Sequence, residues 1–168
     1  IFASANGAFV QSWSGQPQLY QTERVIAGRP YQPRAAAQWG AYSGDPGWAG
    51  WLAQSFLDDP KNVVFVIFDP LRHTNILELV DESLQLLPEE LRWKVTFNTY
   101  LSSLSADSIC NWRFCTGDKE TLRASGWMPK SVVLDLRSSL PSAGMGDLAN
   151  QARTGNIPQP RKSIRVQV

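Results

Sequence analysis

Two carboxylates lie where the sequence predicts the ends of buried strands. Asp69 follows the apolar run Val63–Phe68, and Asp135 lies near the end of the run Ser131–Leu136. In open α/β sheets, ligands bind outside the carboxyl ends of the strands, so any site on this chain is expected there. A pair of acids can hold Mg²⁺ or act as general acid and base. The residues predicted to form this ligand site are Asp69, Asn98, Tyr100, Arg113 and Asp135, with His73 as a neighbour.

The same carboxylates have a structural interpretation, which we favour. An aspartate before a proline commonly makes a turn by accepting backbone amides, and Asp69 precedes Pro70. Asp135 is expected to pair with an arginine such as Arg92 or Arg113. The ligand site is therefore the second hypothesis for this end of the sheet.

Motifs that would supply a nucleophile or hold a nucleotide are missing from the sequence. His73 is the only histidine; it lies in a polar loop, no G-x-S-x-G elbow accompanies it, and we expect it at the surface. The run Gly117–Thr121 lacks the spacing of a phosphate-binding loop. Two cysteines and one histidine disfavour a zinc site made by this chain alone. We predict no catalytic residue, no cofactor and no metal.

Cys110 and Cys115 are five residues apart in a segment that reads as a strand. Their side chains would then lie on opposite faces and about 16 Å apart along the strand. A disulfide between them would require the strand to be broken. A reduced chain in the cytoplasm is the expected setting.

Two Arg/Trp pairs, Arg92-Trp93 and Trp112-Arg113, lie on or beside neighbouring predicted strands. They can stack guanidinium on indole and lock the two elements together, a contact worth about 0.5–2 kcal/mol. The functional alternative is an exposed hot spot for a protein partner, where both residue types are enriched. Packing is the interpretation we favour, because tryptophan is mostly buried.

Composition places the chain among ordinary folded domains. With 168 residues and 43% hydrophobic content, it can bury about 70% of its unfolded surface around one core. A net charge of +1 provides no large field of one sign, so neither nucleic acid nor an anionic membrane is the expected partner. The chain begins at Ile1 without a methionine or a signal peptide, so we expect a piece of a longer polypeptide.

The strands and helices predict an α/β fold. Pro88 ends a helix that begins after Asn75, where Glu78 completes a predicted capping box, and Lys94–Leu101 alternates as a strand with one apolar face. Residues 63–101 thus form a strand-helix-strand crossover between parallel strands, and helices are expected on both sides of the sheet. The prediction is a small mixed β-sheet with flanking helices. Its core strands are 63–68, 95–101 and 132–136; Cys110–Cys115 is expected to be an added antiparallel strand; helices are expected over 34–42 (ended by Gly40), 45–58, 75–87 and 146–153 (ended by Gly155).

Several of these segments carry a family resemblance. The block LPEELRWKVTFNTY over residues 87–100, followed by Cys110-Asn111-Trp112-Arg113 and by Val132–Leu136, resembles the middle region of the bacterial GTPase-associated protein 1 family. The resemblance covers about Trp48–Leu136. It implies a large multidomain protein paired with small GTPases, and it transfers no catalytic motif.

The resemblance implies a non-catalytic interaction or scaffolding module, whose partner is a GTPase or another domain of the same polypeptide. The alternative from the residues is a small-ligand-binding or hydrolytic domain with its site at the strand ends. Residues 1–33 are expected to be irregular or to add strands to a preceding domain, 34–155 to form the core, and 156–168 to form a basic linker or an edge strand.

Overall fold

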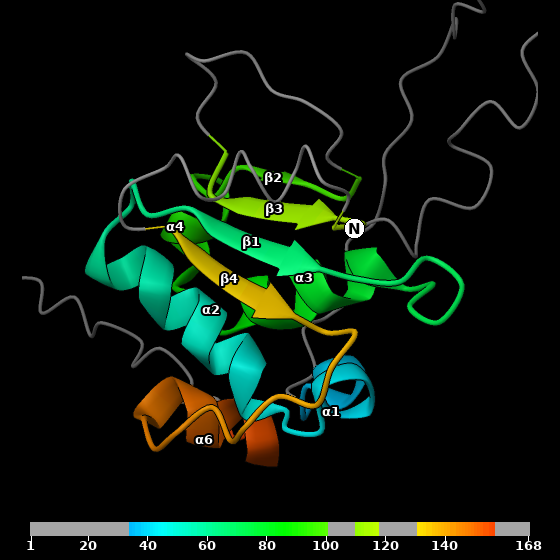
Figure 1. The fold of residues 1–168 in the computed structure, drawn as a ribbon. Helices are drawn as coiled ribbons and strands as arrows, with labels where there is room; N and C mark the ends of the chain where they lie inside the picture. The colour runs from blue at the N-terminus through cyan, green and yellow to red at the C-terminus, as the bar shows by residue number, and fades with distance from the viewer. Residues whose placement is uncertain (1–33, 101–109, 118–130, 157–168) are drawn as a thin grey trace, which may run out of the picture. The chain divides into compact units, whose positions relative to one another are not determined.

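The computed structural model describes residues 34–100, 110–117 and 131–156 (Figure 1). In this part of the chain, four strands form one sheet in the order β2-β3-β1-β4, and every neighbouring pair is parallel. The predicted α/β class is confirmed. The strands are β1 (Val64–Ile67), β2 (Phe97–Asn98), β3 (Trp112–Cys115) and β4 (Val132–Asp135); the helices are α1 (Ala37–Ser43), α2 (Gly47–Asp58), α3 (Ile76–Gln85), α4 (Glu89–Arg92) and α6 (Asp147–Thr154).

The sheet departs from prediction in the place and direction of β3. β1 and β2 are parallel strands of one sheet with α3 and α4 between them in sequence, but β3 lies between them in space. The antiparallel direction expected for Cys110–Cys115 is wrong, because β3 runs parallel to both neighbours. The connection over residues 99–111 reaches the dozen or so residues that a parallel return needs. The handedness of the crossover stays a prediction.

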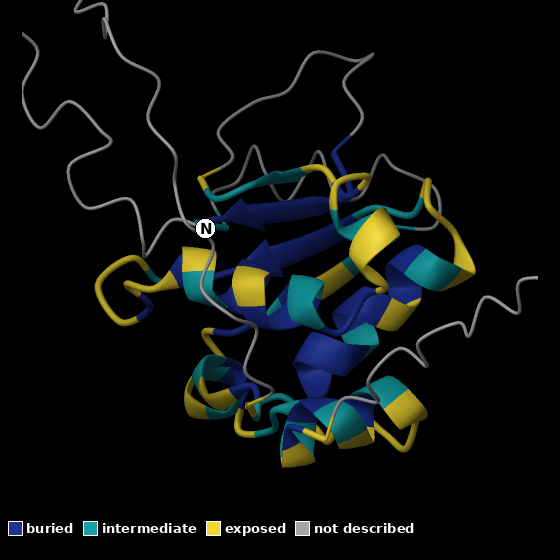
Figure 2. Cartoon of the chain, turned by 180° about the vertical axis from the view of Figure 1, so that it is seen from behind, coloured by how far each residue is buried: buried dark blue, intermediate teal, exposed yellow. Residues whose placement is uncertain are grey.

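The core lies on one face of this sheet. Alternate residues of the central strands, Val64 and Val66 in β1 with Trp112 and Phe114 in β3, join one cluster with side chains of α1, α2, α3 and α6. The opposite face carries a small second cluster of Phe65, Ile67 and Cys115. β1 is buried on both faces, as predicted. The described helices that contribute side chains to the main cluster all pack on one face of the sheet. Figure 2 shows that the central strands β1 and β3 are buried and that the helices carry exposed residues.

β2 is shorter than the predicted strand over residues 95–101. Before it, the Thr96 carbonyl still accepts the amides of Asn111 and Trp112, but the Thr96 amide and hydroxyl donate to the Asn111 side chain (Oδ1) at 3.1 and 2.9 Å. After it, Asn98 Oδ1 accepts the Tyr100 amide at 2.8 Å and turns the chain. Polar side chains at both ends therefore replace strand pairing with local hydrogen bonds.

Glycine and proline residues mark the ends of several helices, but two predictions about helix ends are wrong. α6 ends before Gly155 (φ 72°) as predicted, and Pro88 separates α3 from α4. α1 continues through Gly40 and ends before Gly44, whose φ of 84° favours glycine. The predicted capping box at the start of α3 does not form: Asn75 makes no side-chain cap, and Glu78 pairs with Arg34 at 3.4 Å.

A buried carboxylate joins α1 to α3. Glu82 in α3 accepts the backbone amides of Gln38 and Trp39 at 2.9 and 3.0 Å, and Trp39, which is fully buried, donates its indole N–H to the carbonyl of Leu79 at 2.9 Å. Two of the otherwise unpaired amides of a helix N-terminus are thereby satisfied by one side chain. Burial raises the pKa of Glu82, opposed by these two amides.

Glu82→Gln is expected to lower the free energy of unfolding by about 1–2 kcal/mol at neutral pH, because the new NH₂ group faces an amide that needs an acceptor. The raised pKa means that the contribution of Glu82 to stability falls as pH rises from the ordinary glutamate value through the folded one. Urea denaturation of both proteins at several pH values measures this slope, and an equal slope in the variant would contradict the assignment. Glu90→Gln, the same change at an exposed residue of α4, is the control.

Candidate functional site

The carboxyl ends of the strands meet at one edge of the sheet, as the sequence predicts for its polar candidates. Asp69 follows β1, Asn98 ends β2 and Asp135 ends β4. Arg113 instead lies within β3, opposite Phe65 in the register. The parallel order of the described strands therefore brings the first three positions to the same edge.

Asp69 and Asn98 are engaged in turns. Asp69 Oδ1 accepts the Leu71 amide at 2.9 Å, and the Asp69 amide donates to His73 Nδ1 at 2.9 Å. Asn98 likewise accepts the Tyr100 amide. These contacts are the turn chemistry expected of Asp69 from its position before Pro70.

Asp135 pairs with an arginine that was not foreseen. Arg137 binds it through two hydrogen bonds, Nε to Oδ1 at 2.9 Å and Nη2 to Oδ2 at 2.8 Å, and these bonds lower the pKa of Asp135. The expected partners, Arg92 and Arg113, lie elsewhere. Arg92 donates to the carbonyls of Leu87 and Gln85 at the end of α3, and Arg113 Nε donates to the carbonyl of Cys110. The pairing of Asp135 with Arg137, two residues later, could have been predicted from the sequence motif Asp-Leu-Arg.

The two Arg/Trp pairs lie in different environments. Trp112 is buried in the main cluster, and its Nε1 is the fully buried side-chain nitrogen for which the described residues provide no acceptor. Arg113 is also buried, with its guanidinium carbon 5.3 Å from the centre of the Phe65 ring. Trp93 is exposed. The four residues do not form one surface.

His73 is not at the surface, contrary to the expectation from its polar neighbours. It is 6% exposed, and its ring meets Tyr42 edge to face with 4.6 Å between ring centres. The Tyr42 hydroxyl accepts the amide of Asn75 at 3.1 Å, which ties α1 to the start of α3. The prediction failed because Tyr42, distant in sequence, covers the ring.

Two cavities open beside His73 at this edge. The first, about 420 Å³, is called the basic pocket; the second, about 590 Å³, is called the apolar groove. The basic pocket lies between the end of α1, the loop after β1 and the segment after β4; residues that define it are Tyr42, Gly44, Arg72, His73, Arg137 and Ser138. The apolar groove is defined by Phe68, Pro70, Ile76, Leu77, Thr99 and Tyr100.

Large apolar side chains are exposed around the groove. Leu77 and Tyr100 line it and are 50% and 62% exposed, while Leu71, next to the lining residue Pro70, is 90% exposed. The Tyr100 ring meets Phe68 edge to face at 6.1 Å, which holds it at the wall of the groove. Of the five residues predicted to form a ligand site, Tyr100 alone lines either cavity in the described part of the chain.

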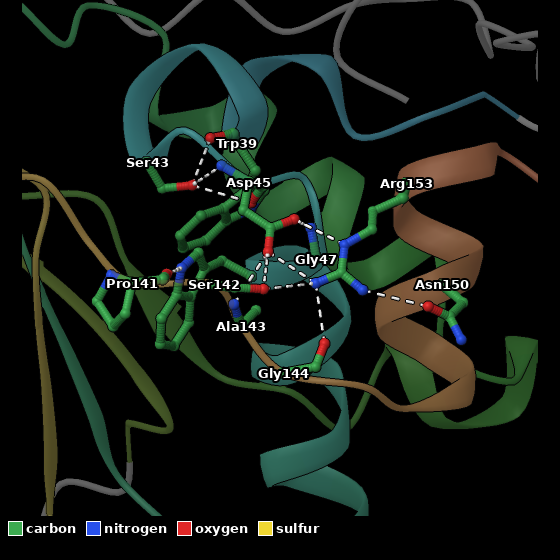
Figure 3. A network of polar contacts seen from close by, with 11 residues as sticks. Trp39, Ser43, Asp45, Gly47, Pro141, Ser142, Ala143, Gly144, Asn150 and Arg153 are labelled. Atoms are coloured by element: carbon green, nitrogen blue, oxygen red, sulfur yellow. Dashed lines mark hydrogen bonds and ion pairs between the residues drawn. The ribbon is translucent and has the colours of Figure 1, made fainter.

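A second polar cluster ties the N-terminus of α2 to α6 (Figure 3). Asp45 accepts two hydrogen bonds from Arg153, Nε to Oδ1 at 2.8 Å and Nη2 to Oδ2 at 2.7 Å. It also accepts the amides of Gly47 and Ala143 and the hydroxyl of Ser142. Arg153 above all holds the pKa of Asp45 well below its ordinary range. The helix predicted over 45–58 begins at Asp45, but the pairing of Asp45 with Arg153 was not foreseen.

The described residues show neither a metal-ligating cluster nor a membrane helix. No group of three or more His, Cys, Asp or Glu side chains in residues 34–100, 110–117 and 131–156 is placed to hold a metal ion. No helix in those ranges combines the length and apolar character of a membrane span. Cys110 and Cys115 are buried and unbridged, in agreement with the spacing argument.

The fold and this edge define an α/β domain with a parallel sheet and an open, partly apolar groove at the carboxyl ends of its strands. Comparison with known families matches residues 35–138 to the GTPase-associated protein 1 middle domain, and this match spans more than half of the 168 residues. The chain belongs to that family. Searches of curated proteins and of solved structures found no match.

Proposed function

We propose that the chain is a non-catalytic interaction module of a bacterial GTPase-associated multidomain protein, and that its apolar groove binds a GTPase. Family membership supports the association with a GTPase. The exposure of Leu71, Leu77 and Tyr100 around one open groove carries the proposal, because exposed apolar side chains gathered at one place mark contact surfaces.

The chemistry of the groove suits a protein partner. Phe68 and Ile76 are buried at its wall, while Leu77 and Tyr100 remain partly accessible, so an apolar side chain of the partner would complete their burial. A tyrosine with apolar neighbours is typical of residues that carry binding energy. Glu78 at the rim adds a charge that can select the orientation of the partner.

The alternative function, a small-ligand or hydrolytic site on Asp69, Asn98, Tyr100, Arg113 and Asp135, has less support from the geometry. Asp69 and Asn98 accept backbone amides, and Asp135 is bound by Arg137. These groups hold turns and strand ends in place. We expect Asp69→Ala to lower stability while binding of the GTPase persists.

The test measures binding of the full-length parent protein to its purified small GTPase, loaded with GTP or with GDP. Leu77→Ser and Tyr100→Ser are each expected to weaken binding about tenfold or more, because truncation at the centre of an interface typically costs at least 1 kcal/mol. Thermal unfolding should show that each variant still folds, because loss of the Tyr100–Phe68 contact or of Leu77 from α3 is expected to cost only about 1 kcal/mol.

Met145→Ser is the matched control, because Met145 is as exposed as Leu71 but lies in the segment before α6 and does not line the groove. Trp93→Ser tests the exposed member of the Arg/Trp pairs as a rival contact. Equal loss with Met145→Ser, or loss with Trp93→Ser alone, would contradict the groove. Binding to another domain of the parent protein, with none to the GTPase, would overturn the choice of partner.

A further inference from the structure

The basic pocket has the chemistry of an anion site, and we propose that it binds the phosphate group of a small ligand. This inference is independent of the docking groove, because it rests on other side chains and requires no protein partner. The two cavities share His73 and little else in the described structure.

His73 presents an unpaired donor to the pocket. Its Nδ1 accepts the Asp69 amide at 2.9 Å, so in the neutral ring the hydrogen is on Nε2. No described residue accepts a hydrogen bond from Nε2, although the His73 side chain lines the cavity. The fully buried unpaired nitrogen of the described residues is Trp112 Nε1, so His73 Nε2 retains access to solvent, and an oxyanion in the pocket would accept its hydrogen in place of water.

Two arginines supply the positive charge. Arg72 lines the pocket and its side chain makes no ion pair or hydrogen bond with the described residues. Arg137 uses Nε and Nη2 on Asp135 and its Nη1 lies beside Gly117, so Arg137 offers the pocket its charge and the remaining Nη hydrogens. The described lining residues include both arginines and no carboxylate. Asp135 and Asp69, which both act on Arg137 electrostatically, lie outside the lining, so the charged side chains that border the cavity itself are the two arginines.

The arrangement of donors favours phosphate over carboxylate. They come from two segments, the loop after β1 (Arg72 and His73) and the segment after β4 (Arg137 and the Ser139 hydroxyl), whereas the Ser138 hydroxyl already donates to the Asp135 carbonyl at 3.2 Å. A phosphate offers oxygens in several directions to arginine and hydroxyl donors, whereas a carboxylate offers two in one plane. The C-terminal end of α1 also borders the pocket and opposes an anion, but its seven residues form only a short helix, and the effect is confined to the last turn.

The sole histidine makes the test direct, because one side chain contributes all the imidazole nitrogen signals of the ¹⁵N-labelled chain. The probes are inorganic phosphate and ribose 5-phosphate, titrated at fixed pH and constant ionic strength, with acetate as the comparison anion. We expect a saturable change in the His73 Nε2–H signal with at least one phosphate probe and a weaker response to acetate. The tighter phosphate probe shows whether the site takes the free anion or a phosphate monoester.

Arg72→Gln is expected to raise the Kd of the better probe about tenfold or more, as the loss of one charge-assisted hydrogen bond does. Lys61→Gln removes the same charge from an exposed residue before β1, at the opposite edge of the sheet, and should leave the Kd unchanged. No saturable change with either phosphate probe, an equal response to acetate, or equal weakening by Lys61→Gln would overturn the proposal. Failure here would leave GTPase binding by the groove unaffected, so the two proposals are separable.

Discussion

Asp45→Asn is expected to lower the free energy of unfolding by about 3 kcal/mol, as breaking one member of a largely buried, multiply bonded ion pair does. The carboxylate accepts five hydrogen bonds and its side chain is 15% exposed, so water replaces few of these bonds. Asparagine keeps the shape but presents an NH₂ group to donors. Urea denaturation at pH 7 measures the difference.

Asp135→Asn is the matched control for this variant. Asp135 also binds an arginine through both oxygens, but the two side chains are 33% and 39% exposed. An exposed pair of this kind contributes about 0–1 kcal/mol. Equal losses in the two variants would show that enclosure of the Asp45 cluster by Ser142, Ala143 and Arg153 adds nothing.

The pH dependence of the Asp45 contribution has a definite sign. Arg153 lowers the pKa of Asp45 in the folded protein, so the unfolded chain takes up a proton first as pH falls. The contribution is complete above the ordinary aspartate pKa near 4 and is lost as pH falls through the folded value. Stability of the parent protein should therefore decline more steeply below pH 4 than that of Asp45→Asn.

Gly50→Ala is expected to lower the free energy of unfolding by about 2–3 kcal/mol, through overpacking against α6. A Cβ at this position would lie 2.3 Å from the backbone carbon and oxygen of Leu148, so one helix must move. In an unobstructed helix the same change would stabilise by about 1 kcal/mol, so the sign alone separates the two cases. Gly146→Ala, where a Cβ meets no atom within 4 Å, is the control; because Gly146 is the N-cap of α6, this change should lower stability by no more than about 1 kcal/mol.

The predictions for Asp45→Asn and Gly50→Ala both concern contacts with α6, which lies beyond the family match. The match ends at residue 138, whereas Arg153 and Leu148 belong to α6 and contact the N-terminal half of α2. Gly155, which ends α6, comes close to Arg34 and Ala35. We propose that α6 folds as part of the same core, with the boundary near residue 155 as expected from the sequence. Removal of residues 139–168 should then lower stability more than either point variant.

Local patterns account for the elements that the sequence predicted well. The apolar run of β1 is buried whatever surrounds it, and Pro88 stops a helix through its own ring. Gly155 ends α6 because its positive φ favours glycine. Asp69 makes its turn with an amide two residues away. Each of these features depends on residues within one or two turns of the chain, so the pattern is visible in the sequence.

The remaining features depend on residues that are far apart in the chain. Whether His73 is buried was decided by Tyr42, and the partner of Asp45 was decided by the docking of α6, 108 residues away. The parallel place of β3 between β1 and β2, and hence which side chains border each cavity, also came only with tertiary structure. Residue types and local spacing set the helices, turns and buried strands of this chain. Its pockets and polar clusters arise where separate elements pack, and one sequence pattern is compatible with many such packings.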